Sequence, residues 1–315
     1  MADEKSVERM ATSATARASV DEQRLDQLAE QRRAEGSRFW RRVRAEKKAF
    51  LGLIFFAVLV IISVGGPIIA PYGADDVSFE QLEKPTLHHP MGTDSFGHDL
   101  LSRVILGTRV SFSVGIVGAI LSMIAGVAAG VVSGYYGGWI DNLIMRVVDL
   151  IWAFPAIVLA MGLVSIYGAG AKNIIIAIAI SNLVAFARIV RGDVLSLRES
   201  DFTLAARSIG VRDGRIMLRH LLPNVAAPIL VQMTLVVGFG ILTETGLTFL
   251  GLGVNPATPT WGQALNDSRN FIHQAWWLAV FPGLAIGFTV LSMNLLGDGL
   301  RDALDVRNVS EAQGT

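Results

Sequence analysis

Five side chains of one short segment could together bind a metal ion: His88, His89, Asp94, His98 and Asp99. Imidazole and carboxylate groups are common ligands of transition metals. The same segment also suits a hydrogen-bonded turn, in which Thr93, Asp94 and Arg103 hold one another. We favour the turn and predict no metal site.

The residue types needed for other chemistry are missing. The chain has no cysteine, which excludes disulfides and thiolate metal sites. It also lacks the G-x-x-x-x-G-K-[ST] loop that cradles nucleotide phosphates, so it cannot bind ATP in that manner. We therefore predict no catalytic residue and no cofactor in this chain.

One acidic side chain, Glu244, lies within an apolar stretch, toward one end of it. A charge at the centre of a bilayer costs roughly 2.5–3.5 kcal/mol on insertion scales, so the side chain should face a cavity or a partner. It could line a pathway and meet an amino group there. We favour a structural role, as a hydrogen-bonded contact with a partner subunit or with an outer loop.

The elements that position these residues are long apolar blocks. Hydrophobic residues make up 52% of the 315 positions, which is too many for an ordinary soluble domain. A helix needs about 20 apolar residues to cross the ~30 Å hydrocarbon layer. Six blocks have about this length: 50–70, 110–133, 146–167, 172–190, 226–250 and 277–297. The sequence predicts an all-α, polytopic membrane protein with six transmembrane helices.

Charged residues are sorted between the segments that join the blocks. Segment 71–105 is acidic, whereas segment 38–48 and loop 192–224 are rich in arginine and lysine. Basic loops stay in the cytoplasm. We therefore expect both termini in the cytoplasm and segment 71–105 outside. Three tryptophans are expected at the outer membrane interface: Trp261, Trp276 and Trp277.

Glycine and proline punctuate the blocks. Gly126, Gly130 and Gly134 recur every four residues, and small residues at this spacing let membrane helices approach closely. We interpret them as a packing groove. Pro155 and Pro282 each remove a backbone donor, so each is expected to kink its helix.

The two ends of the chain form separate predicted units. Residues 1–49 are a cytoplasmic tail, in which 19–35 forms a short surface helix and 38–48 an amphipathic interfacial helix. Residues 50–307 form the transmembrane domain, and 308–315 are a second tail.

The basic loop after the fourth block carries strong helix signals. Ser200 can cap a helix that Gly210 ends in a left-handed conformation. Asp213 can cap a second short helix, and Pro223 should stop it before the next block. The predicted product is a compact pair of helices with arginines around a small apolar face.

This loop also resembles a known motif, the EAA loop of ABC importer permeases: Ala205-Ala206-(three residues)-Gly210-(nine residues)-His220-Leu221-Leu222-Pro223. Stretches 89–115, 244–265 and 294–307 are similar, in order, to the oligopeptide, dipeptide and nickel branch of that family. The resemblance covers about residues 45–307 and points to the C-type subunit of a heterodimeric permease. Leu204 stands where many members have glutamate, and His220 where many have isoleucine, as is familiar in the peptide branch.

The resemblance implies a type I importer permease core in a bacterial inner membrane. It implies as partners a B-type permease subunit, two cytoplasmic ABC ATPase subunits or domains that hold ATP and Mg²⁺, and an external substrate-binding protein. No nucleic acid is expected. The loop would act as a coupling helix, and six residues are expected to dock it on the ATPase: Phe202, Ala205, Ala206, Ile209, Gly210 and Arg215. The turn formed by Thr93, Asp94 and Arg103 would belong to the platform for the binding protein.

The resemblance also implies ATP-driven uptake of short peptides, with nickel chelates, glutathione and oligosaccharides as alternatives. Two other classes are weighed against it. A secondary transporter would need ion-coupling groups at the midplane and repeated halves. A non-transporting scaffold would not need the paired helices of 201–222, which could also be a plain interfacial element.

Overall fold

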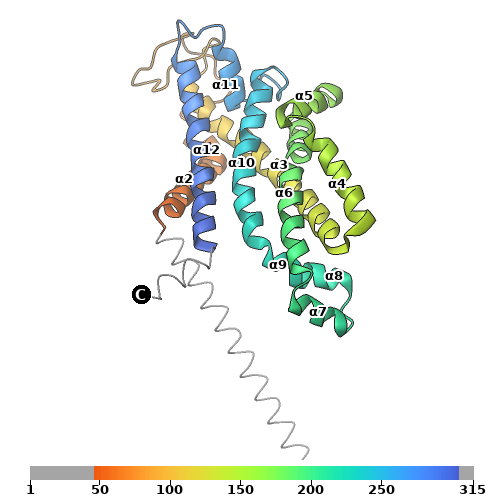
Figure 1. Cartoon of the computed structure of the whole chain (residues 1–315). Helices are drawn as coiled ribbons and strands as arrows, with labels where there is room; N and C mark the ends of the chain where they lie inside the picture. The colour runs from red at the N-terminus through yellow and green to blue at the C-terminus, as the bar shows by residue number, and fades with distance from the viewer. Residues whose placement is uncertain (1–45, 305–315) are drawn as a thin grey trace, which may run out of the picture.

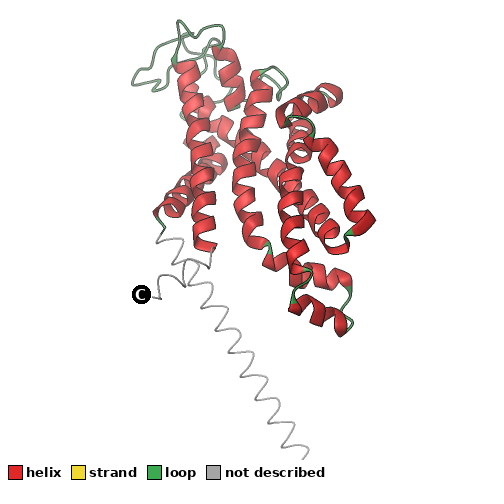
Figure 2. Cartoon of the chain, viewed as in Figure 1, coloured by secondary structure: helices red, strands yellow, loops and turns green. Residues whose placement is uncertain are grey.

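A computed structural model describes residues 46–304, and these residues are mostly helical. Figure 1 shows the helices packed side by side in an elongated bundle, and Figure 2 shows a tangle of loops at one end of it. Within this part of the chain, the only β-type pairing is an isolated bridge between Thr93 and Asp99. The predicted all-α class is confirmed.

Five of the described helices are long and apolar enough to cross a membrane: α2 (Lys47–Ile69), α3 (Leu100–Tyr136), α6 (Ala171–Leu197), α10 (Ala226–Phe249) and α12 (Trp277–Leu304). A sixth crossing is possible only as a bent pair. Helices α4 (Gly138–Trp152) and α5 (Ala156–Tyr167) meet at 88°.

The predicted block 146–167 therefore falls on two helices, with the expected interruption at Pro155 between them. Proline has no N–H and disfavours a helical conformation in the residue before it, so α4 ends at Trp152. Pro155 then takes an extended conformation, with ψ of 131°, directly before α5. The chain changes direction there instead of kinking slightly.

Three other helices extend beyond their apolar blocks. Helix α3 begins ten residues before its block, where the Asp99 carboxylate accepts a hydrogen bond from the Ser102 N–H. Helix α6 continues to Leu197, and α12 runs unbroken through Pro282 to Leu304. Hydropathy marks the part of a helix that lies in lipid, whereas backbone hydrogen bonding can continue past that boundary.

The predicted glycine groove is confirmed and lies between α3 and α6. A Cβ atom on Gly130 would lie 2.7 Å from the carbonyl oxygen of Ala187, and one on Gly134 would lie 2.9 Å from a methyl group of Val194. Real Cβ atoms do not approach neighbours so closely. The two helices pack this tightly because these positions carry no side chain.

Shorter elements lie at the two ends of the bundle: α7 (Asp201–Ser208), α8 (Asp213–Ile216), a π-helical turn (Met217–Leu221), α9 (Leu222–Asn224) and α11 (Trp261–Ser268). Figure 1 places α7 and α8 at the end opposite to α11 and the loop before α3. The arginine-rich loop and the acidic segment therefore lie on different sides of the apolar bundle, as the charge pattern requires.

Two of the three tryptophans expected at the membrane interface are buried instead. The Trp261 Nε1–H donates to the carbonyl of Val104 at 3.0 Å, and the Trp277 Nε1–H donates to the carbonyl of Thr93 at 3.2 Å. Only Trp276 is exposed. A buried indole needs an acceptor for its N–H. These two hydrogen bonds join α11 to α3, and α12 to the loop that contains Thr93.

Some predictions concern residues outside 46–304. These are the helix at 19–35, most of the interfacial helix at 38–48, and the tail at 308–315.

Candidate functional site

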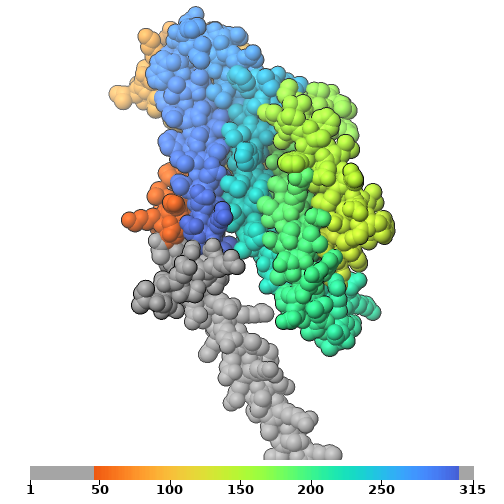
Figure 3. Space-filling model, viewed as in Figure 1, coloured from red at the N-terminus to blue at the C-terminus, as the bar shows by residue number. Residues whose placement is uncertain are grey.

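The arginine-rich loop folds into a compact unit of residues 201–221, called here the plug. Helix α7 ends at Ser208, and Gly210 has a φ of +76°, in the left-handed region that favours glycine. The chain then turns directly into α8. Figure 3 shows the plug protruding from the lower end of the molecule. The predicted pair of helices joined at Gly210 is confirmed.

The details of capping differ from the prediction. The Ser200 hydroxyl donates to the carbonyl of Leu197 at 2.6 Å instead of accepting from α7, so it ties the plug to α6. Arg212, not Asp213, precedes α8. Pro223 does not stop the helical path, since it sits in the first turn of α9, where a missing N–H costs nothing.

The plug has an inner and an outer face. Ala206 and Ile216 are buried and pack against the bundle. The other five residues expected to dock a partner are exposed: Phe202, Ala205, Ile209, Gly210 and Arg215. Ile209 is 81% exposed and Phe202 42%, and Leu204 and Leu218 are exposed as well, so this polar loop carries four exposed apolar side chains. Ala206 packs in the buried core between the plug and the bundle. It therefore does not lie on the exposed face with the other five predicted docking residues.

Tyr135, at the end of α3, anchors the plug to the bundle. Its hydroxyl donates to the Asp213 carboxylate at 2.6 Å, and the Arg207 guanidinium lies 4.7 Å from the centre of its ring. Asp213 and Arg207 thus hold the tyrosine from both helices of the plug. This anchor joins residues more than 70 positions apart, so no spacing in the sequence could have revealed it.

Two ion pairs tie α4 to the α6 helix that leads into the plug. Arg191 donates from Nε and from Nη2 to the two oxygens of Asp141, each at 2.6 Å. Arg188, three residues earlier in α6, donates to Asp149, near the other end of α4, at 2.6 Å. A bidentate guanidinium–carboxylate pair fixes relative orientation as well as distance. The plug, α3, α6 and α4 are thereby linked by polar contacts at one end of the bundle.

At the opposite end, the predicted turn is present. The Asp94 carboxylate accepts hydrogen bonds from the backbone N–H groups of Phe96 and His98, pairs with the His98 ring at 2.7 Å, and lies 3.7 Å from Arg103. Within residues 46–304, no group of three or more His, Cys, Asp or Glu side chains could hold a metal ion.

The three residues expected in a binding-protein platform are nevertheless buried: Thr93, Asp94 and Arg103. They hold segment 71–105 together from within. The exposed large apolar residues of that segment are Val77, Leu87 and Phe96, which were not predicted. Isolated apolar residues on a polar loop were the signal that could have identified them.

Two carboxyl groups at this end of the bundle have shifted pKa values. The hydroxyl and the backbone N–H of Ser78 lower the pKa of Asp76 by hydrogen bonding to its charged form. Burial raises the pKa of Asp267, against the opposing effect of the Gln263 amide 2.9 Å away. Asp76 therefore keeps its charge at lower pH than an ordinary aspartate, and Asp267 becomes protonated at higher pH.

Glu244 is completely buried within its own chain. Thr248, one turn further along α10, donates to its carboxyl group at 2.9 Å. A role of Glu244 at a pathway or at a contact with a partner subunit stays a prediction. The carboxyl group does not reach an outer loop or the surface.

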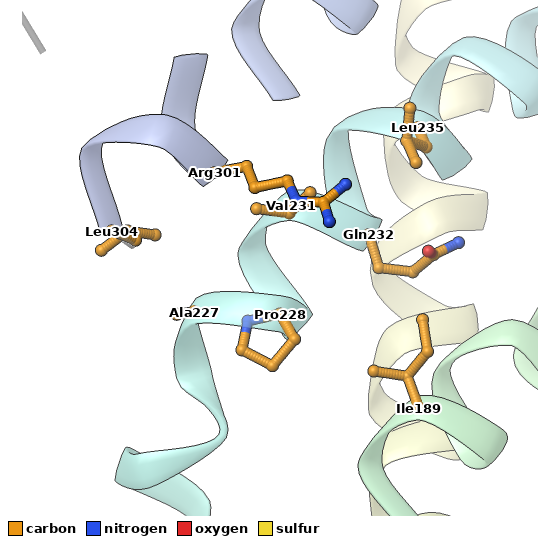
Figure 4. A pocket seen from close by; sticks show the side chains of 8 residues that line it. All are labelled: Ile189, Ala227, Pro228, Val231, Gln232, Leu235, Arg301 and Leu304. Atoms are coloured by element: carbon orange, nitrogen blue, oxygen red, sulfur yellow. The ribbon is translucent and has the colours of Figure 1, made fainter. Parts of the chain in front are cut away.

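A groove of about 410 Å³ opens between α6, α10 and α12 (Figure 4). Eight residues line it: Ile189, Ala227, Pro228, Val231, Gln232, Leu235, Arg301 and Leu304. Its walls are mainly aliphatic, and Gln232 and Arg301 supply the only long polar side chains. This composition suits packing or lipid and offers no set of groups for catalysis.

Comparison with known proteins covers most of the chain. Residues 126–309 match the family described as binding-protein-dependent transport system inner membrane component. Residues 36–88 match the N-terminal transmembrane domain of oligopeptide transport permease C.

Individual relatives agree with these family matches. The chain is 46% identical over 269 residues to the glutathione transport system permease protein GsiD of Escherichia coli O6:K15:H31 and to that of Shigella boydii serotype 4. It is 45% identical to GsiD of Shigella dysenteriae serotype 1. Each alignment covers 85% of this chain and 89% of the relative.

Proposed function

Because this chain belongs to the binding-protein-dependent transport system inner membrane components, as an ABC importer permease of the oligopeptide and dipeptide branch, we propose that it takes up short peptides through ATP-driven alternating access. It is a multi-pass membrane protein, and permease components are not themselves enzymes. In this proposal it sits in a bacterial inner membrane with both termini inside. A B-type permease completes the pathway, and an external binding protein delivers the cargo.

We call the exposed side chains of Phe202 and Ile209 the apolar ridge of the plug. This ridge supports the proposed contact with two ATPase subunits. Phe202 and Ile209 stand on the outer face of a rigid two-helix unit whose inner face is packed and hydrogen-bonded. Apolar side chains surrounded by arginines are typical of a surface that docks into a protein cleft. The chain has no P-loop of its own, so its energy must arrive through such a contact.

The contacts of Tyr135 would transmit movement of the plug to helix α3. When ATP closes the ATPase subunits, the plug follows their cleft and pulls on α3 through the contacts of Tyr135 with Asp213 and Arg207. Helix α3 spans the bundle and leads directly to the outer turn at Asp94. Alternating access requires contacts that differ between two states, and this route joins the two ends of the molecule by one long helix.

Purification and uptake measurements test the proposal directly. The tagged chain, extracted from its native membrane in mild detergent, should bring down a second permease and ATPase subunits. Proteoliposomes of that complex should take up labelled glutathione or alanine peptides only with ATP and the binding protein. Isolation of the chain without an ATPase, or uptake driven by an ion gradient alone, would contradict it.

The cargo class follows from the family branch and remains part of the proposal. The relatives are named for glutathione, a tripeptide, which favours short peptides over metal chelates for this chain. Competition of uptake by di- and tripeptides, against nickel salts, separates the two alternatives.

Gly210 is expected to be required for coupling but not for folding. In Gly210→Val, a β-branched side chain would have to adopt a φ near +76°, although nothing lies within 4 Å of the added Cβ. We expect normal membrane insertion and at least a several-fold loss of cargo-stimulated ATPase activity in the whole complex. Gly210→Asn is the matched control, since asparagine tolerates the left-handed conformation, and it should keep most of the activity.

Tyr135→Phe is expected to weaken coupling by breaking one hydrogen bond. The ring stays buried, so the stability of the chain should change by only about 1–2 kcal/mol. Stimulation of ATP hydrolysis by loaded binding protein should fall several-fold while basal hydrolysis stays. Tyr136→Phe, at the exposed neighbouring position, is the control. Equal stimulation in both variants would exclude the anchor from the route of movement.

A further inference from the structure

An open groove of about 490 Å³ lies where α4 and α5 meet at their bend. Polar side chains of α6 form one wall: Ser181, Asn182 and Arg188. The broken segment forms the other wall and contributes Trp152 and Phe154, both more than half exposed. Irregular backbone at membrane depth is tolerated where it is buried in protein or lines a water-filled cavity, so the bend itself argues against lipid here.

The ion pair at this groove gives a stronger argument. Arg188 and Asp149 bond at 2.6 Å, yet their side chains remain 37% and 55% exposed. Arg188 lies about nine residues, or roughly 13 Å, from the end of α6, a helix about 40 Å long. It lies inside the apolar block 172–190, two residues from the end of that block, in a helix long and apolar enough to cross a membrane. Exposed charges within such a block face a cavity or another protein, because lipid cannot solvate them.

Ser181 carries an independent sign of a missing partner. Its hydroxyl oxygen is buried and has no hydrogen-bond partner within the described chain. A serine in a helix usually donates to the carbonyl four residues earlier, as Ser165 and Ser208 do. The neighbouring Asn182 does donate in that way, to Ile178 at 2.9 Å.

We propose that this groove lines the translocation pathway and touches the cargo, which is a zwitterionic peptide-like molecule. The inference rests on the proposed function and adds the contact site and its chemistry. Arg188 receives the cargo carboxylate and Asp149 receives its ammonium group. The two residues neutralise each other in the empty groove and exchange partners when cargo passes.

The physical advantage of this exchange is that charge stays balanced at every stage. A lone arginine within the membrane would bind an anion tightly and release it slowly. An arginine–aspartate pair can replace its internal ion contact with contacts to the two charged ends of the cargo, and return to the internal contact when the cargo leaves. Asn182, on the wall of the groove, supplies an amide group that can hydrogen-bond a peptide group. The Arg188 guanidinium stacks on the Trp152 ring at 3.7 Å from its centre, and the exposed face of Phe154 accepts varied side chains without demanding one shape.

The absence of cysteine from the chain makes a direct test possible. Ala153 is exposed and lines the groove, so Ala153→Cys places a reachable thiol there and should fold. In proteoliposomes of the whole importer, a charged, membrane-impermeant thiol reagent should label this cysteine. Trialanine or S-methylglutathione, delivered by binding protein, should slow the labelling at least threefold. Phe288→Cys, at an exposed apolar position of α12, is the control and should stay unlabelled.

The outcomes separate the inference from the proposed function. No labelling of Ala153→Cys in any nucleotide state would show that lipid or the sister permease covers the groove, and would overturn the inference. Labelling that neither peptide slows would overturn the cargo contact. In both cases, ATP-dependent uptake by the same proteoliposomes would leave the proposed function standing, whereas its loss in the unaltered importer would remove both.

Discussion

Gly126→Val is expected to disrupt the packing of α3 against α6 and to destabilise the protein. The new Cβ would overlap the carbonyl oxygen of Leu183 and lie 2.7 Å from the Cβ of Phe186. Overpacking typically costs about 1–3 kcal/mol, and the upper end applies here because the obstacles are backbone and Cβ atoms that no rotamer change can move. We expect a fall of several degrees in the unfolding midpoint and a large loss of monodisperse complex.

The control for this change is Gly287→Val in α12, where nothing in the chain lies within 4 Å of the added Cβ. Both substitutions replace a helical glycine with the same residue in a membrane helix. Thermal unfolding followed by fluorescence-detected size-exclusion chromatography measures both. A midpoint for Gly126→Val equal to that of Gly287→Val would mean that α3 and α6 do not pack as described.

Ile209→Asp is expected to abolish recruitment of the ATPase subunits. Ile209 is the most exposed apolar residue of the plug, so its side chain contributes little to packing within residues 46–304. A charge placed in the centre of an apolar interface costs at least about 2 kcal/mol, or roughly 30-fold in affinity. Copurification of the ATPase should be lost, and ATP-dependent uptake should fall by at least tenfold.

Ser208→Asp adds the same charge one residue away and serves as the control. Ser208 is also exposed, and its hydroxyl contributes only a hydrogen bond to the carbonyl of Leu204. This variant should retain the ATPase. If Ile209→Asp copurified with the same amount of ATPase as Ser208→Asp, the apolar ridge would not be the docking surface, and the proposed coupling route would lose its first contact.

The bend at Pro155 shows why hydropathy predicted a span but not its shape. Apolar residues dominate 146–167, with Arg146 and Asp149 near its start, so a count of apolar residues predicts one crossing. Proline indicates that the helix is interrupted, but the angle depends on what the two halves pack against. Helix α5 packs on the first half of α6, while Arg188 and Arg191 hold α4 to its second half.

Local features were predicted well because nearby residues decide them. The conformation of Gly210 depends on its own missing side chain, and the turn at Asp94 depends on groups within four residues of it. The groove of Gly126, Gly130 and Gly134 follows from a spacing that repeats along one helix face. Five of the six apolar blocks correspond to helices of their own for the same reason.

The sequence by itself therefore determined the class, the membrane crossings and the paired helices of the plug. Only the tertiary structure decided that Ala206 faces inward, that Trp261 and Trp277 are buried, and that Glu244 bonds within its own chain. The contact of Tyr135 with Asp213 is of the same kind. Periodicity and charge act along the chain, whereas these contacts join residues that only the packing of separate helices brings together.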